Sequence, residues 1–348
     1  MPNRPTMQSI ADYVRVNKST VSRALNTPER VRPETRSRIL QAAQRLGYFQ
    51  FGEEAVVAEQ SSDDVGLLVD SRTFASPDRF YTEIIRGCLE EANRWKRHVV
   101  VNAMDIESSD TISGLVSEGK VKQLIVIATA PDALQCAIAQ RKIAAIGIDL
   151  ETPSFEFATI YADNSQGTQL LMEHLYGLGH RRAAFAASAY HISFRERHAG
   201  YALALAGAGQ GYDQDLVFLD EEPNEGDRIY QIGRLAVDKF LALPPHRRPT
   251  AIVCGNDPIA LQTVKALTDA GLRVPDDISV TGFDNLDWAG KVSPTLTTVN
   301  IPKLAIGELA LQFVTRMGKP TPASRGIRVS VPVSLVARGS TQPPSEHS

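Results

Sequence analysis

Short apolar runs alternate with longer amphipathic stretches along most of the 348-residue chain. The runs have the length of buried strands, and the stretches repeat apolar residues at helical spacing. The pattern predicts strands at 65–69, 99–102, 124–128, 144–148, 183–187, 251–254 and 279–283, and helices at 80–96, 164–178, 195–208, 229–241, 257–270 and 303–317. Strands that alternate with helices are typical of parallel sheets joined by right-handed crossovers. Because so many units exceed one comfortable sheet, we expect two doubly wound lobes.

The first 48 residues carry a different pattern, which predicts a small all-α head of three short helices. Apolar residues from Met7 to Val14 follow helical spacing. A turn leads to Asn17, a suitable N-cap for a second helix. The third helix begins near Pro33 and ends at Gly47, a natural C′ residue.

The second helix belongs to the stretch VNKSTVSRALN, residues 16–26. Its inward positions are taken by Val21, Ala24 and Leu25. The remaining side chains are short, polar or cationic and must project outward: Lys18, Ser19, Ser22, Arg23 and Asn26. A helix with such a face, preceded by a tight turn, has the helix-turn-helix pattern and suits the major groove of DNA. A solvated helix in a small bundle is the alternative.

Composition and charge sharpen this interpretation. The chain is 43% hydrophobic and 22% charged, as in ordinary soluble proteins. Because no leader or bilayer-length apolar run is present, we expect a cytoplasmic protein with no membrane partner. The net charge of −3 conceals an asymmetry, since residues 1–48 carry nine Lys and Arg against three Asp and Glu. A head of charge +6 on an acidic body favours binding to a polyanion.

Cofactor and catalytic chemistry find little support in the sequence. The three cysteines, Cys88, Cys136 and Cys254, are far apart and are expected to be reduced and buried. No histidine pair has metal-ligand spacing, and no Ser-His-Asp or paired-carboxylate motif is recognisable. The glycine-rich GAGQG, residues 207–211, follows a helix, so it indicates a helix end. We therefore expect no metal, no cofactor and no enzyme activity.

The run TMQSIADYVRVNKSTVSRALNTPERVRPETRSRILQAAQRLGY, residues 6–48, resembles the lactose-repressor (LacI) family of bacterial transcription regulators. The resemblance extends through most of the body to VPVSLVARGST. It implies a DNA-reading head and a body like a type I periplasmic binding protein that senses a small molecule. The implied parts are a head at 1–48, a hinge at 49–64, an effector domain at 65–339 and a disordered tail at 340–348. Lobe 1 would comprise 65–162 and 288–317, and lobe 2 would comprise 163–287 and 318–339, with crossings near Ala162, Asp287 and Met317.

The DNA contacts expected of the head fall into two groups. Groove-facing side chains would be those of Lys18, Ser19, Arg23 and Asn26. Side chains placed for phosphates would be those of Thr6, Asn17, Thr20, Ser22 and Thr35. The partner would be a roughly palindromic double-stranded operator bound by a homodimer, because the tail STQPPSEHS lacks the heptad pattern of a tetramer-forming helix.

Polar residues after the predicted strands outline an effector site. Ligands of open α/β sheets bind beyond the carboxyl ends of the strands. Four strand ends here carry Asp70, Asp149, Asn256 and Asp284, which can grip hydroxyl groups. Opposite them Arg195 and Arg197 could form a fork for ring oxygens, vicinal hydroxyls or an anion. Phe74 and Trp288 are candidates for stacking on a sugar or base.

The resemblance adds roles and reveals departures. It implies that Arg197, Asn256 and Asp284 contact effector. The hinge of the family carries a leucine that wedges into the minor groove, and Val57 aligns with it. The stretch 49–66 holds five acidic residues and no Lys or Arg, which should weaken DNA binding. Either Val57 still inserts, or the heads rely on the major groove alone. Arg15 stands where the turn of the family usually has Gly.

Together these features predict a dimeric transcription regulator, a repressor, controlled by a sugar, sugar acid or sugar phosphate. A purine-type corepressor is a less favoured effector. A cytoplasmic sugar-binding protein without a DNA role is the first rival, and the basic head disfavours it. An enzyme on the doubly wound fold is the second, and the lack of a catalytic constellation disfavours it.

Overall fold

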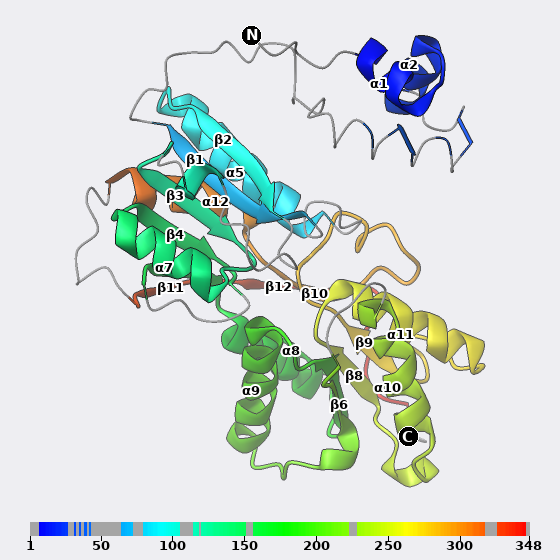
Figure 1. Cartoon of the computed structure of the whole chain (residues 1–348). Coiled ribbons are helices and arrows are strands. Elements are labelled where there is room, and N and C mark those ends of the chain that lie inside the picture. The colour runs from blue at the N-terminus through cyan, green and yellow to red at the C-terminus, as the bar shows by residue number, and fades with distance from the viewer. Residues whose placement is uncertain are drawn as a thin grey trace. The chain divides into compact units, whose positions relative to one another are not determined.

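The protein was analysed as a computed structural model, which describes residues 7–26, 31–32, 35, 38–39, 42, 64–71, 79–104, 114–117, 120–150, 156–222, 228–316 and 326–345. The chain forms two compact units, Met1–Ser61 and Ser62–Ser348 (Figure 1). Each unit has its own buried apolar cluster. The first unit therefore has a core of its own, as the sequence predicts for a head.

The first unit contains helices α1 (Met7–Val14) and α2 (Lys18–Asn26), as the apolar spacing predicts. Its core gathers one face of each helix with two residues of the third expected helix: Ile10, Ala11, Val14, Val21, Ala24, Ile39 and Ala42. The Arg38 guanidinium donates to the carbonyl of Val14 at 3.2 Å, at the last residue of α1. Thr35 and residues 38, 39 and 42 are helical, and the rest of the third helix lies outside the described residues.

The second unit contains two parallel sheets. The six-stranded sheet has the order β11-β5-β4-β3-β1-β2, and the four-stranded sheet has the order β7-β6-β8-β9. The strands of the first sheet are β1 (Val65–Asp70), β2 (Val99–Met104), β3 (Gln123–Ile127), β4 (Ala144–Ile148), β5 (Ala158–Ala162) and β11 (Arg328–Val331). Those of the second are β6 (Ala183–Ser188), β7 (Val217–Asp220), β8 (Ala251–Cys254) and β9 (Ser279–Thr281). The predicted pair of doubly wound lobes is confirmed.

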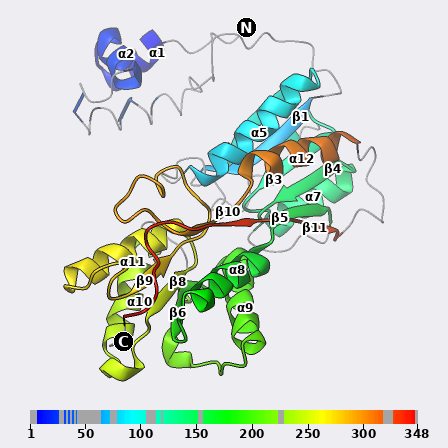
Figure 2. The same ribbon diagram turned by 180° about the vertical axis from the view of Figure 1, so that it is seen from behind.

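Helices cover the sheets of each lobe (Figures 1 and 2). Those of the first lobe are α5 (Phe80–Arg94), α6 (Gly114–Ser117), α7 (Asp132–Arg141) and α12 (Lys303–Arg316). Those of the second are α8 (Asn164–Gly177), α9 (Ile192–Gly207), α10 (Ile232–Leu241) and α11 (Asp257–Asp269), with short 3-10 turns η2 (Gln214–Leu216), η3 (Arg228–Tyr230) and η4 (Pro245–Arg247). Helices α5 and α12 approach so closely at Gly307 that a Cβ there would lie 2.0 Å from the Ile84 carbonyl oxygen. The contact therefore requires a glycine at this position.

The chain crosses between the lobes at points that differ partly from those expected. The first crossing follows Ala162, as predicted. Strand β11 pairs with β5 in the first lobe, so the assignment of 318–339 to the second lobe was wrong for this strand. Thr297 accepts from the Gly282 amide at 2.8 Å and so stays with the second lobe, whereas 288–317 was assigned to the first. The two remaining crossings run through β10 (Thr298–Asn300) and β12 (Ser334–Val336), which pair as an antiparallel ribbon.

The C-terminal segment is part of the second lobe. Ser340 is fully buried. Its carbonyl accepts from the Val280 amide at 2.9 Å, and its hydroxyl donates to the Val280 carbonyl at 2.6 Å. The carbonyl of Gln342 accepts from the ring of His180 at 2.9 Å. The expected disordered tail at 340–348 was therefore wrong for residues 340–345, because this segment runs beside β9 and satisfies its backbone.

Deleting residues 340–348 is expected to destabilise the second unit. The Val280 amide and carbonyl, the Thr297 amide and the His180 ring would lose partners, and each unmade buried hydrogen bond costs about 1–3 kcal/mol. Urea unfolding followed by circular dichroism should show a clearly lower midpoint. Deleting only 346–348 is the matched control and should leave the midpoint unchanged. Equal midpoints for the two deletions would contradict the structural role of the segment.

One expectation about the cysteines was wrong. Cys88 and Cys254 are buried, but Cys136 is exposed on α7. Burial raises the pKa of each of the two buried thiols to about 12, so both stay protonated and unreactive at neutral pH. The error arises because Cys136 lies beside apolar positions of α7 but one step outside the buried face.

Candidate functional site

Helix α2 presents the polar face that the sequence predicts. Val21 and Ala24 are buried, while Lys18 and Ser19 are exposed. The carbonyl of Asn17 accepts from the amides of Thr20 and Val21, which starts the helix at this residue. The face is thus held by the small core beneath it and presents short donors and a cation.

The other expected DNA contacts are described unequally. Asn17 is exposed, and Thr20, Ser22 and Thr35 are half-buried. Arg23 and Asn26 belong to α2, but their side chains lie outside the described part, as do Thr6 and Val57. The DNA contacts expected of all these residues stay predictions.

The turn between α1 and α2 contains a left-handed arginine. Arg15 has φ 56° and is exposed. The next amide, of Val16, donates to the carbonyl of Ala11 at 2.9 Å, which closes the end of α1. Left-handed backbone costs a residue with a Cβ about 1–2 kcal/mol. The turn therefore carries a strain that a glycine would relieve.

Replacing Arg15 by Gly is expected to stabilise the head by about 1 kcal/mol, because glycine adopts this conformation without penalty. Hydrogen exchange of α1 and α2 in the full chain should slow accordingly. Arg15→Ala is the matched control, since it removes the charge and keeps the strain. If both variants exchange alike, backbone strain at this turn is not the cause.

Left-handed residues also gather at the carboxyl ends of the strands in the second unit. Ala128 follows β3, Asp149 follows β4, and Asp284 with Asn285 follows β9, with φ of 68°, 46°, 108° and 50°. Such conformations cost of order 1–3 kcal/mol and cluster at functional sites. Two of them, Asp149 and Asp284, are expected effector contacts, and Asn285 follows Asp284 in the chain. Left-handed backbone and the predicted polar residues therefore occur together after β4 and β9.

Arg197 lies at the centre of the second lobe's site. Its side chain is about 5% exposed. Its Nε donates to Asn164 Oδ1 at 2.9 Å, Nη1 donates to the Gly255 carbonyl at 2.6 Å, and Nη2 lies 3.2 Å from Asp284 Oδ1. The guanidinium carbon stacks 3.8 Å from the centre of the Phe283 ring. The structure thus brings together Arg197 and Asp284, two of the residues expected to contact effector.

A second cation supports the turn that carries Asp284. Lys303, the first residue of α12, donates to the carbonyls of Asp284 and Asn285. Burial lowers the pKa of Lys303, while nearby Asp284 and Asp257 oppose that shift. Asp257 is fully buried and accepts from the Leu286 amide and the Thr298 hydroxyl, at 2.8 and 2.6 Å. Its burial raises its pKa to about 6.

Asp149 joins the lobes at the same edge. The hydroxyl of Tyr81, on α5, donates to Asp149 Oδ2 at 2.8 Å. The ring of His191, at the start of α9, lies 3.2 Å from the Asp149 carbonyl oxygen. Asp70, at the end of β1, is buried. Asp70 and Asp149 therefore both lie at carboxyl ends of strands in the first lobe, as the sequence predicts.

Some expected site residues have other roles in this structure. Arg195 and Arg197 do not form one fork, because the exposed Arg195 side chain donates to the carbonyls of Ala189 and Tyr190, at 3.0 and 2.7 Å. Asn256 caps α11 through its side-chain oxygen, which accepts from the Ile259 amide at 3.0 Å. Trp288 is half-buried against the main apolar cluster. Phe74 lies outside the described residues.

Sequence reasoning missed three residues of the site. Asn164 begins α8 after strand β5, whose run ATIYA was not identified as a strand because Thr and Tyr interrupt its apolar character. Lys303 follows Pro302 at a helix start, and His191 precedes a helix by one residue. A polar residue at the start of a helix was the available signal in each case.

Among the described residues, no group of His, Cys, Asp and Glu could hold a metal ion. In the same part of the chain, none of the helices combines the length and apolar character needed to cross a membrane.

Two family models match the chain. The one described as "Bacterial regulatory proteins, lacI family" matches residues 6–50, and the "Periplasmic binding protein-like domain" matches residues 172–341. The HTH-type transcriptional repressor CytR of Escherichia coli (strain K12) is 28% identical, covering 97% of this chain and 96% of that protein. The probable HTH-type transcriptional repressor ExuR of Bacillus subtilis (strain 168) is 27% identical, covering 88% and 90%.

Solved structures show the same architecture. The transcriptional regulator CelR in complex with cellobiose has a TM-score of 0.68 and 26% identity, and the match covers 97% of this chain and all of that chain. The lac repressor dimer bound to operator and the anti-inducer ONPF has a TM-score of 0.66 and 25% identity, covering 98% of this chain and 100% of that one.

The polar helix of the head and the buried site of the two-lobed body define a DNA-binding transcription regulator with a ligand-binding domain. The head matches the lacI family of bacterial regulatory proteins over residues 6–50, and the chain is similar along nearly its whole length to HTH-type transcriptional repressors.

Proposed function

We propose that the protein is a cytoplasmic homodimeric repressor that binds a roughly palindromic operator and releases or holds it according to a small-molecule effector. The observation that carries the DNA role is the exposed face of Asn17, Lys18 and Ser19 above the buried Val21 and Ala24. Such a face suits base edges and phosphates of the major groove. Repression and dimerisation follow the relatives, among them the lac repressor dimer on its operator.

The proposed contacts of the head retain the division expected from the sequence. Lys18, Ser19, Arg23 and Asn26 would face the groove. Phosphates would be bound by Thr6, Asn17, Thr20, Ser22 and Thr35. We place the head at 1–48 and the hinge at 49–64, where Val57 would insert weakly because the linker is acidic.

Arg23→Ala is expected to lower operator affinity by about 1–3 kcal/mol and to reduce the salt dependence of binding, because a cation at the DNA is lost. A gel shift on the region upstream of the protein's own gene, repeated over a salt series, measures both effects. Arg234→Ala removes an exposed cation from α10 in the other unit and is the matched control. Binding that is unchanged by Arg23→Ala would overturn the DNA-reading role of α2.

The charges of the interlobe site favour a neutral, polyhydroxylated effector such as a sugar. The charge of Arg197 is matched by Asp284, and Lys303 is committed to backbone carbonyls. Asp70 and Asp149 add two carboxylates to these strand ends, and carboxylate oxygens suit hydroxyl donors. CelR has been solved with cellobiose. A sugar acid, a sugar phosphate and a purine are the alternatives, and each would need a cation that Arg195 does not supply here.

The proposed effector contacts are those of Asp70, Phe74, Asp149, Arg195, Arg197, Asn256, Asp284 and Trp288. Arg197 and Asp284 are the best supported of these contacts, since both side chains are buried and Arg197, on α9, meets Asp284 after β9. Effector binding would change the lobe arrangement, and operator affinity can change only by the difference in effector affinity between the two arrangements.

A ligand at 100 times its dissociation constant should stabilise the protein by about 2.7 kcal/mol. Thermal-shift measurements with cellobiose, ribose, a hexuronate and a hexose phosphate should give a shift with a neutral sugar. Asp284→Asn should abolish that shift, because it removes the charge beside Arg197. Asp269→Asn, at an exposed position of α11, is the control. A shift with only the charged compounds would contradict the neutral class.

Two rival functions are weaker. A sugar-binding protein without a DNA role would have no use for the exposed cationic face of α2. An enzyme is disfavoured because the relatives are transcription regulators.

A further inference from the structure

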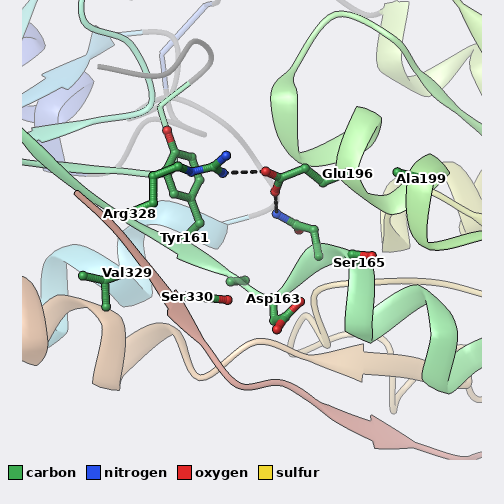
Figure 3. A pocket seen from close by; sticks show the side chains of 10 residues that line it. Tyr161, Asp163, Ser165, Glu196, Ala199, Arg328, Val329 and Ser330 are labelled. Atoms are coloured by element: carbon green, nitrogen blue, oxygen red, sulfur yellow. Dashed lines mark hydrogen bonds and ion pairs between the residues drawn. The ribbon is translucent and has the colours of Figure 1, made fainter. Parts of the chain in front are cut away.

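A cavity of about 380 Å³ lies beside the first crossing between the lobes. Its walls come from both lobes: Tyr161 and Arg328 on strands β5 and β11, and Ser165 and Glu196 on helices α8 and α9 (Figure 3). None of the effector contacts expected from the sequence lines it. The cavity is therefore lined by other residues than those predicted for the strand-end cleft, and Asn164, which lines it, also binds Arg197.

An ion pair spans this cavity. The Arg328 guanidinium of the first lobe pairs with Glu196 Oε1 of the second, as Figure 3 shows. The guanidinium carbon also lies 4.3 Å from the centre of the Tyr161 ring, on the neighbouring strand. Arg328 and Glu196 side chains are 44% and 26% exposed. A pair so exposed contributes little by itself, about 0–1 kcal/mol.

Asn164 connects this pair to the buried arginine. Its Nδ2 donates to Glu196 Oε2 at 3.0 Å, and its Oδ1 accepts from Arg197 Nε at 2.9 Å. A carboxylate can only accept, so Glu196 fixes which end of the Asn164 amide faces Arg197. Asn164 itself is 1% exposed, so losing either partner would leave a buried amide group to be satisfied.

We propose that Glu196 and Arg328 are positioning residues for Arg197. The ion pair holds the Asn164 amide, and the amide holds the Arg197 guanidinium in the orientation that meets Asp284. Because Arg328 belongs to the first lobe, the orientation of Arg197 depends on the lobes being in contact at this point. The proposal deepens the proposed effector function of Arg197 and rests on it for its regulatory meaning.

The chain of contacts makes a remote effect the distinguishing sign. Arg197 touches Gly255 and Asp284. Among the described residues, Glu196 and Arg328 instead contact each other, Asn164 and the Tyr161 ring. Two backbone amides report on those segments: Asp257 donates to the Phe283 carbonyl at 2.8 Å, and Asp284 donates to the Val299 carbonyl at 2.9 Å. If the ion pair has no effect on Arg197, removing it should leave hydrogen exchange at these two amides unchanged.

The test is hydrogen exchange of the full chain without ligand, comparing the parent with Glu196→Gln and Arg328→Gln. Both variants are expected to speed exchange at the Asp257 and Asp284 amides by about three- to tenfold, the equivalent of one lost hydrogen bond. Combining them should add little to either alone, because both break the same relay. Arg328→Lys keeps the charge and should retain most of the parent protection.

Arg273→Gln is the matched control, because it removes an arginine of the second lobe that is 71% exposed and paired with Asp276 and Asp277. It should leave the Asp257 and Asp284 amides unchanged. Faster exchange confined to β11 and the first turns of α9 would overturn the proposal. If the relay responds as expected but the parent protein shows no thermal shift with any sugar, the positioning role stands and the proposed effector function fails.

Discussion

The arrangement of the second unit depends on how the charge of the buried Arg197 guanidinium is neutralised. An arginine cannot lose its proton in a protein, so burying Arg197 requires an anion and several acceptors around it. Asn164, Gly255 and Asp284 supply them from the start of α8, the end of β8 and the end of β9. Three segments that are far apart in the sequence are therefore held at one point. The same point belongs to the effector site that we propose.

The strand ends around Arg197 retain a costly backbone that a purely structural edge would not need. Asp149, Asp284 and Asn285 are left-handed without being glycines, and Lys303 donates to the carbonyls of two of them. Asp257 is buried beneath this turn and binds the Leu286 amide and the Thr298 hydroxyl. These contacts hold the backbone of the turn that carries Asp284 and Asn285. A pre-formed site of this kind reduces the conformational entropy that the protein loses when a ligand binds.

The sequence predicted the helices and most strands closely, because amphipathic helices and continuous apolar strands leave a periodic pattern. Strands β5, β7, β10, β11 and β12 were not predicted, since short runs such as ATIYA and VFLD lack that pattern. The edge strand β11 was assigned to the wrong lobe, because pairing partners of an edge strand depend on which strand is adjacent in space. Arg197 and Asp284 were each expected at the effector site, from family resemblance and from the strand-end position of Asp284, but their ion pair was not predicted. The fork of Arg195 with Arg197 was not formed, because neighbouring residues of a helix point in different directions.

The sequence by itself determined the two-lobed α/β body, the small helical head and the polar face of α2, because each follows from local periodicity and charge. It also placed carboxylates at the ends of strands, since those positions follow directly from the strands. Only the tertiary structure decided which of these groups meet. Asn164 joins Arg197 to Glu196, Ser340 is buried beside Val280, and Arg15 adopts a left-handed turn. Such pairings join residues far apart in the chain or depend on the path of the backbone, and no local pattern encodes either.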